Sequence, residues 1–198
     1  MALPASEAFW DDLFRDAAAS FGLVTYEQDW MNVQTDRFGP LLQDAALGSR
    51  WLAQMGAAAA RCGVSIQYCM SYCRHVLASV ESAAVTQVRA SGDYRAGNDL
   101  WAPLGVTGML AYALGLAPSK DTFWSTADQP GNRWGEGTRE PFSRLQAAVA
   151  TLSKGPVCPS DAVGKTDVAL ILRSAAADGT LLQPDRPAAL LDRCFVTR

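Results

Sequence analysis

Residues 85–94 read VTQVRASGDY, which is the pattern of a buried strand that ends in a turn. The β-branched and apolar side chains of the first five residues favour an extended strand. A Ser-Gly pair then allows the chain to pivot, and Asp93 follows it. Residues 22–32, GLVTYEQDWMN, repeat this design, because an apolar strand again leads to an aspartate, Asp29.

Short apolar segments alternate with helical patterns outward from this stretch in both directions. Amphipathic or alanine-rich periods, several of them ended by glycine, predict helices over 6–22, 44–63, 74–83, 103–116, 140–155 and 165–179. Strands are predicted between the helices at 23–31, 64–70, 85–91, 121–126 and 155–161. Strands that are each followed by a helix indicate a parallel sheet with right-handed crossovers, so the predicted class is α/β.

Length and charge limit the kinds of partner. The chain has 198 residues, enough for one domain with a core, and its net charge of −3 gives no support for nucleic-acid binding. No apolar run approaches the roughly 20 residues that cross a bilayer, so no membrane partner is expected. The opening MALPASEAFWDDLF lacks the basic and apolar parts of a signal peptide, and the sequence predicts no localisation.

Several common kinds of catalytic site are not favoured by the sequence. Cys69, Cys73 and His75 do not have the spacing of a common zinc site, and the odd count of five cysteines indicates buried, reduced thiols. His75 is the only histidine, and no nucleophile motif lies beside it. The Gly-Lys-Thr within DAVGKTD lacks the upstream glycine of a phosphate-binding loop. We therefore predict no metal and no organic cofactor.

A polar cluster follows each predicted strand, as it does at the catalytic face of a barrel. Five strand–helix units fall short of the eight units and about 250 residues of a (β/α)8 barrel. The sequence therefore predicts a partial TIM barrel, in which residues 1–198 are the C-terminal portion of a catalytic domain. This portion would contain strands four to eight with their helices, and the first three strands would be absent.

Three stretches together carry a resemblance to a known family: RASGDY, GPVCPSDAVGK and DGTLLQPDRPAALLDRCF. Over about residues 25–195 the chain resembles the catalytic barrel of raffinose synthases and seed imbibition proteins, in glycoside hydrolase family 36 of the α-galactosidase clan. The resemblance implies a retaining α-glycosidase or transglycosidase that acts on α-galactosides such as raffinose-type oligosaccharides. An oligosaccharide is the implied partner.

The resemblance also implies two catalytic carboxylates. Asp29 corresponds to the nucleophile on the fourth strand, and Asp93 corresponds to the acid/base after the sixth. Family members often carry a second aspartate where this chain has Gly92, and they usually carry a lysine where it has Glu27. The Glu27 departure weakens the expectation of galactose specificity, while the two-carboxylate chemistry is unaffected.

Four further residues are candidates for substrate binding. Trp30 and Trp124 can stack on a sugar ring or pack in the core, and Arg89 can hold a hydroxyl or form a salt bridge. Asp161 can bind hydroxyls, or it can cap the helix that follows.

The sequence leaves two alternatives to an active enzyme for α-galactosides. One is a truncated or degenerate homologue that binds carbohydrate without catalysis. The other is an enzyme that is specific for α-glucosides, which Glu27 favours. The absence of three strands would leave two open sheet edges, through which a homo-oligomer could form.

Overall fold

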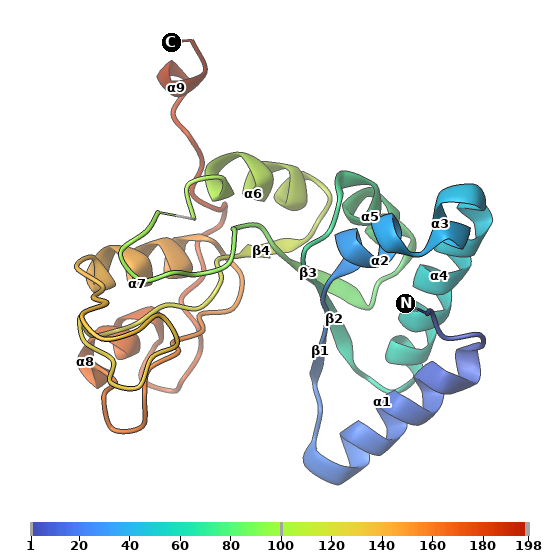
Figure 1. The fold of residues 1–198 in the computed structure, drawn as a ribbon, viewed down its shortest axis with the longest axis horizontal. Coiled ribbons are helices and arrows are strands. Elements are labelled where there is room, and N and C mark those ends of the chain that lie inside the picture. Colours follow the sequence, from blue (N-terminus) through green and yellow to red (C-terminus); the bar gives the residue numbers. More distant parts are fainter. Residues whose placement is uncertain (1, 100, 197–198) are drawn as a thin grey trace. The chain divides into compact units, whose positions relative to one another are not determined.

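The computed structural model describes residues 2–99 and 101–196 of the chain (Figure 1). The described chain divides into two compact units, of which the first contains Met1–Arg89 and Leu114–Leu116 and the second contains Ala90–Ala113 and Ala117–Arg198. A parallel sheet of four strands has the order β1-β2-β3-β4. The predicted α/β class is therefore confirmed, while a closed or partial barrel remains a proposal.

The first unit begins with helix α1 (Glu7–Phe21), as the sequence predicted. Trp10, Phe14 and Ala17 recur at helical spacing and are buried. The helix ends at Gly22, which takes the left-handed conformation that glycine adopts without a steric penalty. The rings of Trp10 and Phe14 pack on Tyr26 of strand β1, so α1 lies against one face of the sheet.

Three strands of this unit confirm predicted strands: β1 (Thr25–Gln28), β2 (Ser65–Tyr68) and β3 (Val85–Arg89). Strand β1 pairs with β2 in register, and β2 pairs with β3 across one irregularity after Ile66. The predicted alanine-rich helix forms α4 (Ala45–Arg61), and the next predicted helix forms α5 (Cys73–Ala78) with the short η1 (Ser79–Glu81). Each strand therefore reaches the next through a helix, and all three point the same way.

Two short helices that the sequence did not predict lie between β1 and α4. They are α2 (Met31–Arg37) and α3 (Gly39–Gln43). Trp30, with φ 60°, turns the chain from β1 directly into α2. The residues predicted as a polar cluster after this strand therefore run directly into the first turn of α2.

The second unit contains α6 (Leu104–Ala113), β4 (Ala117–Ser119) and α7 (Ser143–Leu152). Its core is largely aromatic and consists of Tyr94, Ala96, Phe123, Trp124, Ala147 and Ala150. Helix α7 contributes the two later alanines, whose small side chains allow the bulky rings to approach the helix.

Two predicted strands do not form as predicted. Residues 121–126 and 155–161 pair through an isolated parallel bridge between Phe123 and Pro159, and not through a ladder of two regular strands. Prolines 156 and 159 have no N–H group, which limits the ladder that this segment can build. Strand β4 forms instead a few residues ahead of 121–126.

The long helix predicted over 165–179 is also wrong in its length. The structure contains only α8 (Val168–Ile171) and the turn η2 (Leu172–Ser174), and a last short helix, α9 (Arg193–Val196), was not predicted. The Ser174 hydroxyl donates to the Ile171 carbonyl, and the chain becomes extended at Ala175. A local hydrogen bond of this kind competes with helix continuation. Within the described ranges, no helix combines the length and the apolar character that a membrane crossing requires.

Candidate functional site

The strands of the first unit place two different kinds of side chain on the two sheet faces. Tyr26 packs on helix α1, so by the two-residue period of a strand its neighbours Thr25 and Glu27 face away from that helix. The hydroxyls of Thr25 and Ser65 lie 2.8 Å apart and hydrogen bond to each other, which places Ser65 on the same face. This second face is polar, although both faces of a parallel sheet are commonly apolar.

The carboxyl ends of β1 and β2 bring three chemically active groups together on the polar face. A carboxylate oxygen of Glu27, a carboxylate oxygen of Asp29 and the sulfur of Cys69 all lie within 4.8 Å of one another. Cys69 follows β2 as Asp29 follows β1, and the Cys69 amide donates to the Gln28 carbonyl at 2.9 Å. The regular pairing of two parallel strands thus sets the spacing of this cluster.

The Asp29 carboxylate is half-buried and receives hydrogen bonds. The backbone N–H of Trp30 donates to its Oδ1 at 2.6 Å, and the Cys69 thiol also donates to the Asp29 carboxylate. Donors of this kind restrict the orientation of a carboxyl group. The sequence prediction that Asp29 lies at a strand end is confirmed, while its catalytic role stays a prediction.

The Cys69 thiol is fully buried and keeps its proton. Burial, and then hydrogen bonds to the carboxylates of Asp29 and Glu27, raise the pKa of this thiol, against the opposing charge of Arg89. The charge of Arg89, at the end of β3, therefore acts on the same cluster. Three strands contribute to one polar centre, and Cys69 acts in it as a neutral hydrogen-bond donor.

The same three ligand types could hold a divalent cation. Glu27, Asp29 and Cys69 are close enough, but zinc binds the thiolate form of cysteine. A cation at this place would have to displace the proton of the Cys69 thiol, whose pKa is raised by burial.

Trp30 is exposed beside this centre, with 56% of its surface accessible. Its positive φ places the indole at the start of α2, next to Asp29. The exposed ring is available for stacking, so the packing alternative for Trp30 is not supported.

The second unit contains the other predicted residues. Asp93 is exposed in the segment that follows β3. Trp124 is only 4% exposed and packs against Tyr94 and Trp134, with ring centroids 6.2 and 5.2 Å away. Packing in an aromatic core therefore accounts for Trp124.

Asp161 links two loops of the second unit. Its carboxylate accepts from the backbone N–H and the hydroxyl of Ser125, at 2.7 and 2.6 Å, and from Nε2 of Gln129 at 2.7 Å. The alternative that Asp161 caps the following helix is wrong, because Asp167 caps α8 by accepting from the N–H of Leu170. Its proposed contact with sugar hydroxyls stays a prediction.

His75 has both ring nitrogens engaged within the first unit. Nδ1 accepts from the Tyr72 N–H at 3.0 Å, and Nε2 lies 3.2 Å from the Thr35 hydroxyl. Burial, with a smaller effect of Arg74, lowers the pKa of His75 to about 4. A neutral structural histidine therefore explains this residue.

Sequence reasoning did not propose Cys69 as a site residue, although a signal was present. Cys69 stands in the polar cluster after β2, at the position that Asp29 occupies after β1. The same rule of strand ends that selected Asp29 therefore selects Cys69.

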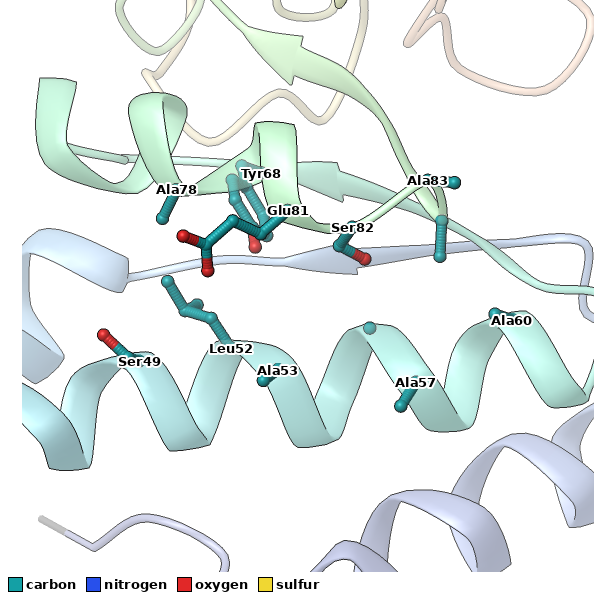
Figure 2. A pocket seen from close by; sticks show the side chains of 12 residues that line it. Ser49, Leu52, Ala53, Ala57, Ala60, Tyr68, Ala78, Glu81, Ser82 and Ala83 are labelled. Atoms are coloured by element: carbon teal, nitrogen blue, oxygen red, sulfur yellow. The ribbon is translucent and has the colours of Figure 1, made fainter.

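A cavity of about 440 Å³ lies on the opposite face, between α4 and the segment 78–84 (Figure 2). Tyr68 and Glu81 point toward Leu52 across it, and alanines of α4 line its floor. None of the predicted site residues lines this cavity. Its walls are mostly methyl groups, so it offers few groups for chemistry.

Comparisons with models of protein families, with curated proteins and with solved structures find no significant match to this chain.

Proposed function

We propose that the chain is the C-terminal portion of a (β/α)8-type catalytic domain that acts on α-galactosides as a retaining glycosidase or transglycosidase. The proposal is supported by one observation above all: Glu27, Asp29 and Cys69 meet at the carboxyl ends of adjacent parallel strands. In barrels of this type, chemistry occurs at the carboxyl ends of the strands.

Asp29 takes the role of nucleophile in this proposal. A nucleophilic carboxylate must be ionised and held in one orientation. The Trp30 N–H and the Cys69 thiol help to hold the Asp29 carboxylate in one orientation, because each donates to it. Attack on the anomeric carbon forms a glycosyl ester of Asp29 and breaks the bond to the leaving oxygen.

Asp93 takes the role of acid/base. It gives its proton to the leaving oxygen, and it then removes a proton from water or from an acceptor sugar, which releases the product with retained configuration. Retaining enzymes require about 5 to 5.5 Å between the two carboxyl groups. The exposure of Asp93 gives it access to a substrate.

Trp30 and Glu27 bear on which sugar is bound. The exposed Trp30 ring can stack on the apolar face of a pyranose beside Asp29. Glu27 is an acceptor of hydroxyl protons where family members carry a donor, so α-glucosides belong in the assay beside α-galactosides.

Covalent trapping tests the proposal directly. The purified chain is incubated with aziridine inhibitors of α-galactose and of α-glucose configuration, which esterify a retaining nucleophile, and the labelled peptide is sequenced by mass spectrometry. We expect one label on Asp29, and none in Asp29→Asn. Asp16→Asn is the matched control, because Asp16 is an exposed aspartate of α1. Label on another residue, or no label from either inhibitor, would refute the assignment.

Azide separates catalysis from binding alone. The substrates are aryl glycosides of the sugar configuration whose aziridine labels Asp29. Asp29→Gly should not hydrolyse them, and added azide should restore turnover. The product should then be a glycosyl azide of inverted anomeric configuration. A wild-type chain that quenches its tryptophan fluorescence with sugar but shows no turnover would instead support a carbohydrate-binding homologue.

A further inference from the structure

Two segments of the second unit are joined beside Asp93. One is 90–94, which follows β3, and the other is 119–122, at the end of β4. The Ala90 N–H donates to the Ser119 carbonyl at 2.9 Å, which aligns the two segments. Asp121 lies two residues beyond this point.

Asp121 hydrogen bonds on both sides of Asp93. Its backbone N–H donates to the Ser91 hydroxyl at 2.8 Å, and its carboxylate accepts from the backbone N–H of Tyr94. Ser91 and Tyr94 enclose only Gly92 and Asp93 between them. The ends of this short exposed segment are thus held by a single residue.

Buried groups anchor both partners of this contact. The Tyr94 hydroxyl donates to Glu140 at 2.8 Å, and Glu140 is only 1% exposed. Lys120 is 3% exposed, and its Nζ donates to the Asp121 and Thr122 carbonyls at 3.1 and 2.7 Å. The Lys120 ammonium also lies 4.9 Å from the centre of the Tyr94 ring.

We infer that Asp121 is a positioning residue for the acid/base Asp93, an inference that rests on the proposed function. The bond from the Tyr94 N–H, which uses the Asp121 carboxylate, restricts the backbone directly after Asp93, and the bond from the Asp121 N–H holds the Ser91 hydroxyl two residues before it. Loss of the carboxylate therefore frees the backbone next to Asp93 and widens the range of positions of its carboxyl group. A general acid must lie within hydrogen-bond reach of the leaving oxygen, so loss of this restriction impairs proton transfer. Asp121 itself contacts no reacting atom in the proposed reaction.

The dependence on the leaving group tests this role. Asp121→Ala and Asp121→Asn are compared on methyl and 2,4-dinitrophenyl glycosides of the configuration that the wild type cleaves. The methyl glycoside needs a general acid to leave, and the dinitrophenyl glycoside does not. We expect Asp121→Ala to lower kcat/KM for the methyl glycoside about 100-fold and for the activated one less than about 5-fold. Asp121→Asn retains an accepting oxygen and should stay within about 3-fold of wild type on both.

Asp178→Ala is the matched control, because Asp178 also accepts from a backbone N–H, that of Thr180, in an exposed turn. It should resemble wild type with both leaving groups. Equal losses on the two glycosides in Asp121→Ala would indicate general disruption and overturn the positioning role. Unchanged kinetics in Asp121→Ala would overturn it as well.

Amide hydrogen exchange tests the hydrogen bond between Asp121 and the Tyr94 N–H without using enzyme activity, so it distinguishes this inference from the proposed function. The Tyr94 N–H should be protected from deuterium exchange in wild type and in Asp121→Asn, and it should exchange at least about tenfold faster in Asp121→Ala. A wild type that cleaves no glycoside would refute the proposed function, and the catalytic role of Asp121 with it. An unchanged exchange rate in an active Asp121→Ala would refute only the inference about Asp121.

Discussion

The Cys69 thiol donates a hydrogen bond to the Asp29 carboxylate, across two adjacent parallel strands. A buried thiol thereby orients a half-buried carboxylate at the edge of a polar sheet face. This relationship separates Cys69 from the other cysteines, of which Cys73, Cys158 and Cys194 are exposed.

Cys69 should therefore be slow to react with thiol reagents. Burial and the two neighbouring carboxylates raise its pKa, so the reactive thiolate is scarce. In a titration with a disulfide reagent at pH 8, the three exposed thiols should react within minutes, and Cys69 should react only in denaturant. Mass spectrometry of the modified peptides identifies each site. Rapid native-state labelling of Cys69 would contradict the buried donor.

Gly56 on helix α4 should not tolerate a methyl group. A Cβ at this position would stand 2.2 Å from Oγ and 3.0 Å from Cβ of Ser82, so the Ser82 side chain must turn away or the two segments must move apart. Gly56→Ala should lower the free energy of unfolding by about 1–3 kcal/mol, measured by urea denaturation.

Gly48→Ala is the control for this substitution on the same helix. Its added Cβ would meet only Leu41 Cδ2, at an ordinary 3.7 Å, so alanine should stabilise the helix by up to about 1 kcal/mol. Adding Ser82→Gly to Gly56→Ala should recover part of the loss. If the two alanine variants had equal stability, the close approach at Ser82 would be wrong.

Lys120 should make the folded state more stable as pH rises. Burial lowers its pKa from 10.5 to about 8, so between these values the unfolded chain holds a proton that the folded chain has released. Raising the pH through this window therefore favours folding.

The measurement compares the Tm of wild type with that of Lys120→Met. From pH 7.5 to pH 10 the difference, wild type minus variant, should rise by roughly 3–6 °C. Groups shared by the two proteins titrate equally and cancel. A constant difference would show that Lys120 is not buried as a cation.

His75 should make the protein less stable in mild acid. Its pKa is lowered from 6.5 to about 4, so below pH 6.5 the unfolded chain takes up a proton before the folded chain does. Stability from this group is complete above pH 6.5 and is lost as the pH falls toward 4. Between pH 7 and pH 4.5, wild type should lose about 2 kcal/mol more than His75→Gln, measured by urea denaturation. Equal losses in the two proteins would contradict a neutral buried imidazole.

The elements of the first unit follow from local patterns in the sequence. Helix α1 repeats apolar residues at helical spacing and ends at a glycine, and strand β2 alternates partly exposed with buried residues. These signals act over a few residues, so they can be recognised without knowledge of the fold. The placement of Asp29 and Cys69 at strand ends follows from the same patterns.

The second unit shows where local patterns fail. Residues 121–126 have the composition of a strand, yet their aromatic side chains serve a core built with Tyr94 and helix α7, and the partner segment contains prolines that cannot donate to a ladder. Strand formation needs a suitable neighbour, and that neighbour is remote in sequence.

Local chemistry thus specified the α1–β1–α4–β2 succession and the carboxylate after its first strand. Folding alone established which groups face that carboxylate, because the Cys69 contact joins residues that lie 40 positions apart in the chain. The same holds for Asp161 and Asp121, whose hydrogen bonds to Ser125 and Tyr94 depend on loops that only the assembled cores bring together. Hydrogen bonds form over a few ångströms, and distance along the chain does not reveal them.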